Sequence, residues 1–305
     1  MQQVITILEP QSGLVHEYAP RLTAFEFTNK KSGIQSKKVV LFIGGLTDGL
    51  LTVPYLPKLA EGLDGIGWSL VQILFSSSYT GWGTGSLKRD ADEISLLVQY
   101  LRSERGGNRS QVVLFGHSTG CQDTVQYLSK FTKTSKDMEV DGGILQAPAS
   151  DREAISTFFN KEKIAEYSAE AREYIKQGKS EHTLPKKFSD AFLGAPVSAY
   201  RWLSLAEVGG DDDFFSSDLT KEYLTPIFGN IKKPLLVLYS GNDECVPDHV
   251  DKQKLIDGWK ETMDPQFWSR YSKVVPGAKH NVGPGSDKDA LKILIDSACS
   301  FLQDL

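Results

Sequence analysis

A serine flanked by glycines follows a short apolar run and has the context of a catalytic nucleophile. The pentapeptide Gly116-His117-Ser118-Thr119-Gly120 comes directly after the apolar residues 112–115 and opens a segment of helical period, 121–131. A G-x-S-x-G motif between a strand and a helix is typical of a nucleophile elbow, where the serine occupies a strained turn and glycines let backbone approach. The motif predicts Ser118 as a nucleophile at the carboxyl edge of a sheet.

A serine hydroxyl is a weak nucleophile near neutral pH and needs a base that a carboxylate orients. Two later turns, each after an apolar run, carry these residue types. Asp243 follows residues 235–240, and His280 follows residues 273–275. The chain order serine, acid, histidine is the order expected for a nucleophile elbow in a doubly wound sheet. We therefore predict a catalytic triad of Ser118, Asp243 and His280.

Other residues of the same types are alternatives for two of these roles. Glu244, beside the predicted acid, and Asp151, after an earlier apolar run, are the substitutes for Asp243. Four other histidines are weaker candidates for the base: His16 before the sheet core, His117 next to the serine with its ring expected to point away, His182 in a helical region, and His249 at the start of a helix after the acid turn.

Acyl transfer through a tetrahedral intermediate also needs two preorganised N–H donors for the oxyanion. The backbone N–H of Thr119, directly after the nucleophile, is the first candidate. The second is expected from the loop at residues 44–49, which begins with paired glycines after the apolar run 39–43. By position we predict the N–H of Leu46, with Thr47 as the alternative.

No motif predicts a cofactor or a metal. The segment at residues 81–86 resembles a dinucleotide loop, but Ser86 stands where G-x-G-x-x-G needs its third glycine, and the Lys-Ser/Thr of a P-loop is missing. We interpret it as the loop between the fourth strand and its helix. No cluster of histidines and cysteines has metal-ligand spacing.

Composition narrows the class of protein further. The 305 residues include 34 basic and 39 acidic side chains, a formal charge of −5, which excludes the basic field that nucleic-acid binding needs. No run reaches the length of a membrane span, and the first residues lack the basic leader of a secretory signal. Three widely spaced cysteines suit a reducing compartment. We expect a cytoplasmic protein; its oligomeric state is open.

Short apolar runs alternate with segments of helical period, which predicts an α/β protein. Nearly continuous apolar strands fit a mostly parallel, doubly wound sheet covered on both faces. Two early runs, 4–8 and 22–28, are expected to form an antiparallel edge, which makes eight strands. The other six predicted strands are 39–43, 69–74, 112–115, 143–145, 235–239 and 273–275. Helices are expected at 87–102 and 287–302.

The alternation stops at residues 151–225, which have helical patterns but no convincing strand. We predict that this segment is a helical cap inserted into a core of residues 1–150 and 226–305. It holds ten basic and fourteen acidic side chains. The acid run 211–213 is expected to be a solvated loop, or else to attract a substrate with free amines. Its aromatic residues either pack the cap or line an apolar slot: Phe158, Phe159, Phe188, Phe192, Tyr200 and Trp202.

With these motifs the chain resembles the α/β-hydrolase superfamily from residue 39 to residue 280 and through the final helix. Residues 41–50, 79–83 and 116–120 further resemble the fungal SidJ-type hydrolases, which include intracellular fusarinine siderophore esterases. This resemblance implies an enzyme without a cofactor that cleaves ester bonds between hydroxamate units, with iron as part of the substrate. Gly44 departs from the superfamily pattern, in which many members carry histidine there.

Two other functions are compatible with the same residues. A carboxylesterase, thioesterase or lipase would use the same triad on acyl chains, with a long apolar slot under the cap. A non-catalytic ligand-binding protein on a hydrolase scaffold would lack a member of the triad, and all three residue types are present here. A serine esterase acting on small-molecule esters, with no nucleic-acid partner and no membrane insertion, is the prediction that these observations favour.

Overall fold

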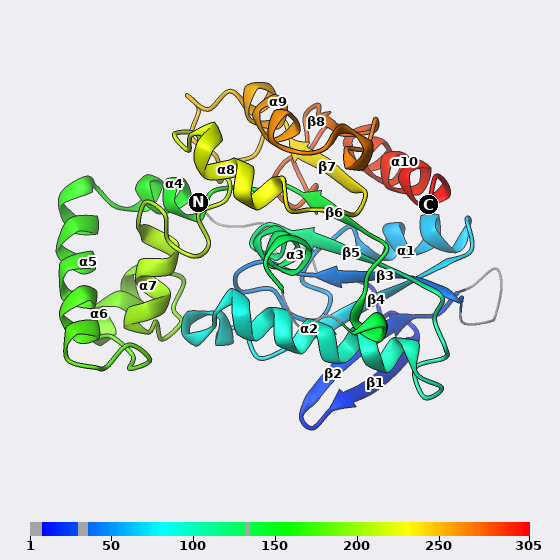
Figure 1. Cartoon of the computed structure of the whole chain (residues 1–305), viewed down its shortest axis with the longest axis horizontal. Coiled ribbons are helices and arrows are strands. Elements are labelled where there is room, and N and C mark those ends of the chain that lie inside the picture. Colours follow the sequence, from blue (N-terminus) through cyan, green and yellow to red (C-terminus); the bar gives the residue numbers. More distant parts are fainter. Residues whose placement is uncertain (1–7, 30–35, 132–134) are drawn as a thin grey trace.

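The computed structural model describes residues 8–29, 36–131 and 135–305 and contains one eight-stranded sheet. The strands lie in the order β1-β2-β4-β3-β5-β6-β7-β8 (Figure 1). Their bounds are β1 Gly13–Ala19, β2 Leu22–Phe27, β3 Lys38–Ile43, β4 Trp68–Leu74, β5 Gln111–His117, β6 Gly142–Gln146, β7 Leu235–Ser240 and β8 Lys273–Val275. This strand order, together with the parallel pairing of most adjacent strands, confirms the predicted doubly wound sheet.

The antiparallel edge is present, but its outer strand differs from the prediction. β1 pairs antiparallel with β2, and β2 with β4, whereas all pairs among β3 to β8 are parallel. The predicted run 4–8 lies outside the described residues except for its last position, and β1 is the edge strand of the sheet within the described residues. This strand escaped prediction because Leu14 and Val15 on it are exposed, so no buried stripe marks it.

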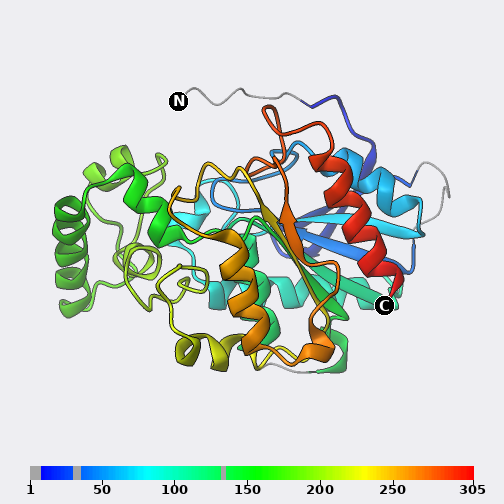
Figure 2. The same ribbon diagram turned by 90° about the horizontal axis from the view of Figure 1, so that it is seen from above.

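Helices cover both faces of the sheet. Figure 2 shows α1 and α10 on one side and α3 and α9 on the other. Every residue of β6 and β7 is buried between them, as expected for parallel strands covered twice. The bounds are α1 Leu56–Asp64, α2 Leu87–Arg102, α3 Gly120–Ser129, α8 Lys221–Phe228, α9 Lys252–Thr262 and α10 Ala290–Gln303; short 3₁₀ turns are η1 Gly81–Thr84, η2 Lys136–Met138 and η3 Pro265–Phe267.

The predicted helix at 87–102 is observed with the same bounds, for local reasons. Its apolar residues Ile94, Leu97 and Leu101 recur at helical spacing and are fully buried. The hydroxyl of Ser86 accepts a hydrogen bond from the N–H of Arg89 and caps the first turn. Ser86 caps α2, and the residues before it connect β4 to this helix. This agrees with our interpretation of residues 81–86 as a strand-to-helix connection.

Four helices between β6 and β7 form a group beyond the end of the sheet, which we call the helical insert (Figure 1). They are α4 Asp151–Phe158, α5 Lys161–Lys176, α6 Lys186–Ala191 and α7 Ala199–Ala206. Their apolar side chains form a cluster of their own, which also includes Trp82 from η1. The division of the chain into a core and a cap at residues 151–225 stays a prediction. No helix of the described residues is long and apolar enough to cross a membrane.

The aromatic residues of the helical insert pack against one another. Phe188 and Phe192 are buried, and Trp202 meets their rings edge to face at centroid distances of 5.4 and 6.2 Å. Trp82 joins the group through Phe192, at 5.4 Å. Phe158, in contrast, is 64% exposed. These rings therefore hold the helical insert together and fix it to η1.

The acid run at residues 211–213 is mostly buried, so the expectation of a solvated loop was wrong. Asp212 is 2% exposed and accepts a hydrogen bond from the guanidinium of Arg201 at 2.7 Å. Asp213 is 5% exposed and is paired with Arg152 at 3.0 Å. The basic partners lie on earlier helices, Arg201 on α7 and Arg152 on α4, so the charge run alone does not reveal the pairing.

Candidate active site

Ser118 lies on a tight turn between β5 and α3. Its φ is 54°, in the left-handed region that is costly for a residue with a side chain. A Cβ on Gly116 would lie 2.1 Å from the carbonyl oxygen of Gly120, and a Cβ on Gly120 would lie 2.2 Å from that of Ile43. Both glycines are thus required by close backbone approach, and the turn has the geometry of a nucleophile elbow.

The structure brings together the three residues predicted as a triad. His280 Nε2 lies 2.7 Å from Ser118 Oγ. On the other side of the ring, Nδ1 lies 2.9 and 2.8 Å from the two carboxylate oxygens of Asp243. Asp243 is 4% exposed, so the ion pair with the imidazole forms away from bulk water. This series of hydrogen bonds can move the serine proton to the imidazole while the carboxylate fixes the ring.

Polar side chains hold the loops that carry the acid and the base. The carboxylate of Glu244 accepts a hydrogen bond from the backbone N–H of His280 at 3.0 Å. The side-chain amide of Gln146, at the end of β6, donates to the carbonyl of His280 at 3.1 Å. Glu244 therefore positions the histidine loop and does not contact the ring nitrogens that Asp243 occupies. Sequence reasoning missed Gln146, although a polar residue at the end of a buried strand is a usable signal.

The remaining predicted alternatives lie elsewhere, with one correction. The ring of His117 does not point away, because its centroid is 5.1 Å from that of His280. Its Nδ1 is hydrogen-bonded to the side chain of Gln146, which holds the ring beside that of His280. His16 is buried against Glu26, and His182 and His249 are exposed. The helix after the acid turn begins at Lys252, beyond His249.

Asp151 lies behind the turn that carries the nucleophile. Its carboxylate accepts hydrogen bonds from the hydroxyl of Thr119 at 3.1 Å and from the amide of Gln122 at 2.7 Å. It therefore supports the first turn of α3 and is not the partner of the histidine. Burial, with a smaller contribution from Asp212, raises the pKa of Asp151 to about 7.

The predicted oxyanion donors belong to two loops that meet at the nucleophile, the loop of Gly45 and the turn of Ser118. In the described part of the chain, no hydrogen bond engages the backbone N–H of Leu46 or of Thr119. A Cβ on Gly45 would lie 3.0 Å from Ser118 Oγ, which shows how closely this loop packs on the serine. The N–H of Gly45 donates to Asp48 at 2.8 Å and shapes the loop. The roles of Leu46 and Thr119, with Thr47 as the alternative, stay predictions.

The pKa values of the two neighbouring histidines move in opposite directions. Burial alone would lower the pKa of His280, but the Asp243 carboxylate outweighs it and holds this pKa well above its usual value. Burial, followed by the charge of His280, lowers the pKa of His117 to about 4. Asp243 therefore stabilises the protonated form of the His280 ring, whereas His117 stays neutral beside it.

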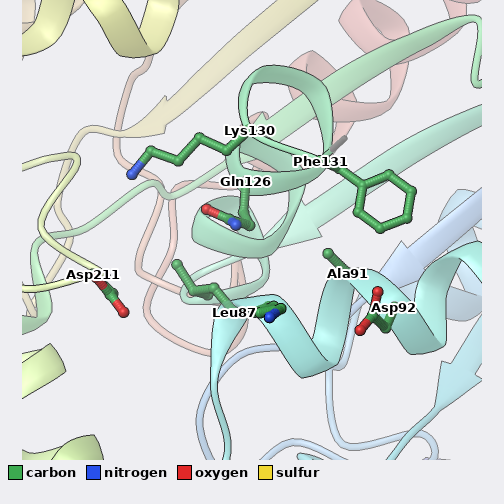
Figure 3. Close-up of a pocket in the computed structure, with 8 residues that line it drawn as sticks. Leu87, Ala91, Asp92, Gln126, Lys130, Phe131 and Asp211 are labelled. Atoms are coloured by element: carbon green, nitrogen blue, oxygen red, sulfur yellow. The ribbon is translucent and has the colours of Figure 1, made fainter. Parts of the chain in front are cut away.

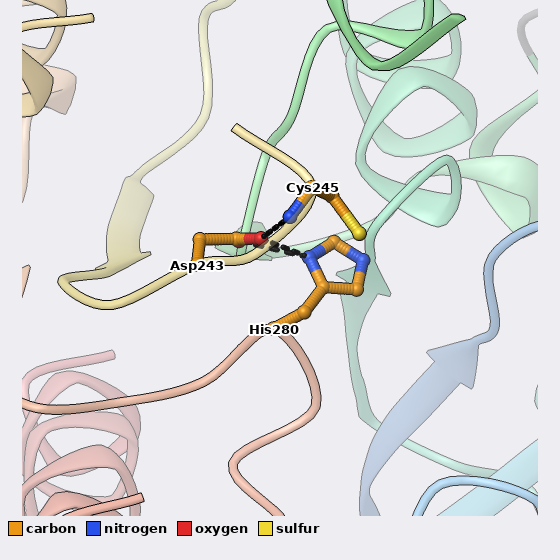
Figure 4. A group of neighbouring side chains, drawn as sticks. All are labelled: Asp243, Cys245 and His280. Atoms are coloured by element: carbon orange, nitrogen blue, oxygen red, sulfur yellow. Dashed lines mark hydrogen bonds and ion pairs between the residues drawn. The ribbon is translucent and has the colours of Figure 1, made fainter. Parts of the chain in front are cut away.

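The fold also assembles a group of potential metal ligands that the sequence spacing did not indicate. Ligand atoms of Asp243, Cys245 and His280 lie within 4.8 Å of one another (Figure 4). Within the part of the chain that the structure describes, this is the one such group. The sequence spacing did not indicate this group, because the strand-end loops after β7 and β8 meet only in the folded chain.

A cavity of about 300 Å³ lies away from these residues, between α2 and α3. Figure 3 shows Gln126 of α3 and Lys130, the residue after this helix, above Leu87 of α2, with Asp211 at the side. None of the predicted catalytic residues lines it. The cavity is therefore distinct from the candidate active site at the carboxyl edge of the sheet.

Comparisons with known proteins agree with this fold. A UPF0613 protein of Schizosaccharomyces pombe is 42% identical, with coverage of 95% of this chain and 96% of that protein. The fusarinine C esterase SidJ of Aspergillus fumigatus is 33% identical, with coverage of 96% of each. The solved structure of the siderophore hydrolase EstB from Aspergillus fumigatus superposes with a TM-score of 0.83 at 32% identity, over 97% of this chain and 98% of that chain.

The model of the protein family described as "Protein of unknown function (DUF1749)" matches residues 6–303. The match covers both strand-end loops, the helical insert and the elbow. Together with the relatives, it establishes the family over nearly the whole length of the protein. The chain belongs to the DUF1749 family and has the α/β-hydrolase fold.

Proposed function

We propose that the protein is a serine hydrolase that cleaves carboxylic ester bonds, with Ser118 as nucleophile, His280 as base and Asp243 as its orienting acid. The observation that carries this proposal is the hydrogen-bonded series from Ser118 Oγ through both nitrogens of His280 to Asp243, at 2.7 and 2.8 Å. Its position at a strained elbow supports the same reading, because strain of this kind is kept where function requires it.

In the first half of the proposed reaction, Ser118 forms an ester with the acyl part of the substrate. His280 Nε2 takes the proton of the hydroxyl as Oγ attacks the carbonyl carbon. The N–H groups of Leu46 and Thr119 stabilise the oxyanion, each contributing about 3–4 kcal/mol in the transition state. The imidazolium then gives its proton to the leaving alkoxide, and the alcohol departs.

In the second half, water repeats the same steps on the acyl-enzyme. His280 removes a proton from the water, the hydroxide attacks the carbonyl, and the proton passes to Ser118 Oγ as the acid leaves. Asp243 keeps the imidazole in one tautomer and stabilises its charged form throughout. The reaction needs no cofactor.

For the substrate, we propose esters of hydroxamate siderophores of the fusarinine type, cleaved in the cytoplasm so that iron is released. The support is the similarity along the whole chain to a fusarinine C esterase and to a siderophore hydrolase. Iron belongs to the substrate in this proposal. The acid run 211–213 does not contribute to it, because Asp212 and Asp213 are buried in ion pairs.

Product analysis by mass spectrometry tests the proposal directly. The purified protein and its Ser118→Ala variant are incubated with ferric and iron-free fusarinine-type siderophores and, separately, with nitrophenyl acetate. We expect the parent protein to release monomers and linear oligomers and the variant to release none, because only the parent has the nucleophile.

The experiment can contradict the esterase activity and the siderophore substrate separately. Hydrolysis of nitrophenyl acetate without cleavage of the siderophores would support the esterase activity and contradict the proposed substrate. Activity that rises steeply with acyl chain length in a nitrophenyl ester series would favour an acyl esterase or lipase instead. Full activity of Ser118→Ala would remove the serine mechanism.

A further inference from the structure

We propose that Cys245, His280 and Asp243 form an inhibitory binding site for Zn²⁺ at the active centre. The three side chains come from two loops, after β7 and after β8, and one ligand atom of each lies within 4.8 Å of the others. Thiolate, imidazole and carboxylate are the three side-chain types that bind zinc in proteins. Figure 4 shows the carboxylate and the sulfur close to the imidazole.

The distances suit one small ion after modest movement of the side chains. Zinc bonds of about 2.0–2.3 Å in a tetrahedron place the ligand atoms about 3.3–3.7 Å apart. The carboxylate and imidazole are already closer than this, at 2.8 Å, since they share a hydrogen bond. Binding therefore requires the carboxylate and the imidazole to separate slightly, with loss of their hydrogen bond, and the Cys245 sulfur to contact the same ion.

The backbone around the site is already held in position. The N–H of Cys245 donates to the Asp243 carboxylate at 2.9 Å, which ties the thiol to the acid. The N–H of His280 donates to Glu244 at 3.0 Å, which ties the two loops together. Cys245 and His280 are half-buried, so solvent ions reach them, while Asp243 is buried beneath. A preorganised, reachable set of ligands lowers the cost of binding.

Zinc at this position would stop the proposed reaction whichever ring nitrogen it takes. Nε2 of His280 is the atom that faces Ser118, so an ion bound there occupies the lone pair that would accept the serine proton. An ion on Nδ1 displaces the hydrogen bond to Asp243 and leaves the proton on Nε2, which then cannot accept another. In both cases Cys245 loses its thiol proton to solvent as the zinc–sulfur bond forms.

The sulfur ligand gives the site its selectivity. Thiolates favour Zn²⁺, whereas Mg²⁺ prefers oxygen ligands and keeps its water. We therefore expect Zn²⁺ to inhibit and Mg²⁺ to have no effect at equal concentration. The inhibition rests on the function proposed above, but binding does not, and the experiment separates the two.

Binding is measured first, in the Ser118→Ala variant, by competition with a chromophoric zinc chelator under metal-free, thiol-free buffer. One zinc per chain is expected. Adding Cys245→Ser is expected to weaken it at least about tenfold, because loss of even an outer-shell partner costs that much. Cys299→Ser is the matched control, since this half-buried thiol lies on α10, away from the site.

Inhibition is measured next with nitrophenyl acetate, each variant relative to its own zinc-free rate. The proposal expects reversible inhibition of the parent and of Cys299→Ser, relieved by a chelator, and at least about tenfold lower sensitivity of Cys245→Ser. Equal zinc affinity with and without Cys245, or no bound zinc, would overturn it. Absence of esterase activity alongside zinc binding that depends on Cys245 would refute the proposed function and leave the metal site standing.

Discussion

Gly45 packs against the side chain of Ser118 so closely that its missing Cβ is part of the site. An added Cβ would lie 2.6 Å from Ser118 Cβ and 3.0 Å from its Oγ. The neighbouring carboxylate of Asp48 fixes the loop through the N–H of Gly45. The loop therefore cannot retreat to admit a methyl group without breaking this bond. The residue thus couples the shape of the predicted oxyanion loop to the position of the nucleophile.

Replacing Gly45→Ala is expected to lower kcat/KM for nitrophenyl acetate about a hundredfold, because a displacement of about 1 Å at reacting groups costs that much. Gly258→Ala on α9 is the control. No atom lies within 4 Å of an added Cβ there, and alanine should stabilise the helix by about 0.5–1 kcal/mol. Steady-state kinetics and urea unfolding check both variants. Kinetic constants of Gly45→Ala equal to those of the parent would show that the loop moves to admit the methyl group without displacing Ser118, contrary to this prediction.

At the scale of elements, Arg201 links the helical insert to the rest of the protein. This residue of α7 is 1% exposed, donates to the carbonyl of Trp82 in η1 at 3.0 Å, and pairs with Asp212. A backbone hydrogen bond from the N–H of Ser198 to the carbonyl of Gly83 runs beside it at 2.8 Å. The insert is thus attached to the loop that precedes α2 by charge, backbone bonds and aromatic packing together.

Removing this charge is expected to cost about 3–5 kcal/mol of unfolding free energy, because Asp212 would keep a buried, uncompensated charge. The variant is Arg201→Met, measured by urea unfolding. Arg172→Met is the control: its side chain is 54% exposed, and loss of its pair with Glu207 should cost less than about 1 kcal/mol. The double variant Arg201→Met/Asp212→Asn should recover part of the loss. Equal effects of Arg201→Met and Arg172→Met would contradict the anchoring role.

The elements that sequence predicts best are those with a buried stripe or a long local pattern. The six inner strands and α2 follow directly from apolar runs and helical period. The outer strand β1 does not, because its exposed Leu14 and Val15 leave no alternation. The insert was expected to be helical, but the partners of its acids were not foreseeable. Arg152 and Asp213 meet only through tertiary contacts.

At the scale of the whole molecule, several buried carboxylates gather between the elbow and the insert. Burial raises the pKa of Asp90 to about 6 and that of Asp123 well above its usual value. Asp151, beneath Thr119, belongs to the same group. One oxygen of Asp123 has no hydrogen-bond partner in the described part of the chain. Arg201 is the buried cation among them, so further ionisation meets mutual repulsion.

These raised pKa values predict that the protein loses stability as pH rises. A carboxyl group with a higher pKa in the folded state holds its proton there when the unfolded chain has released it. Unfolding then releases protons, so stability falls between the ordinary carboxyl pKa and the raised one. We expect Tm to fall between about pH 5 and pH 8, and Asp151→Asn to flatten this fall.

Differential scanning fluorimetry across this pH range measures the effect. Asp257→Asn is the control, because this carboxylate is exposed on α9 and should leave the slope of the parent unchanged. A Tm that is constant or rises with pH in the parent would show that these carboxyl groups ionise without penalty in the folded protein.

Some residues of the candidate site were predictable from the local sequence, and others were not because their contacts form only in the folded protein. Ser118, Asp243 and His280 were predictable because each follows a strand, and parallel strands end at one edge. Their distances agree with that expectation, while their catalytic roles stay predictions. The supporting contacts of Gln146 and the proximity of Cys245 to the histidine depend on loops that meet only after folding. The ring of His117 was misplaced for the same reason.

The position of the helical insert has a consequence for how such proteins diversify. The strands on either side of it, β6 and β7, are parallel neighbours, so the chain must cross the sheet between them in any case. Lengthening or shortening this crossover changes no register in the sheet and leaves the turns at Ser118, Asp243 and His280 in place. During evolution, a lineage can therefore exchange these helices while the three turns at the carboxyl edge of the sheet stay unchanged.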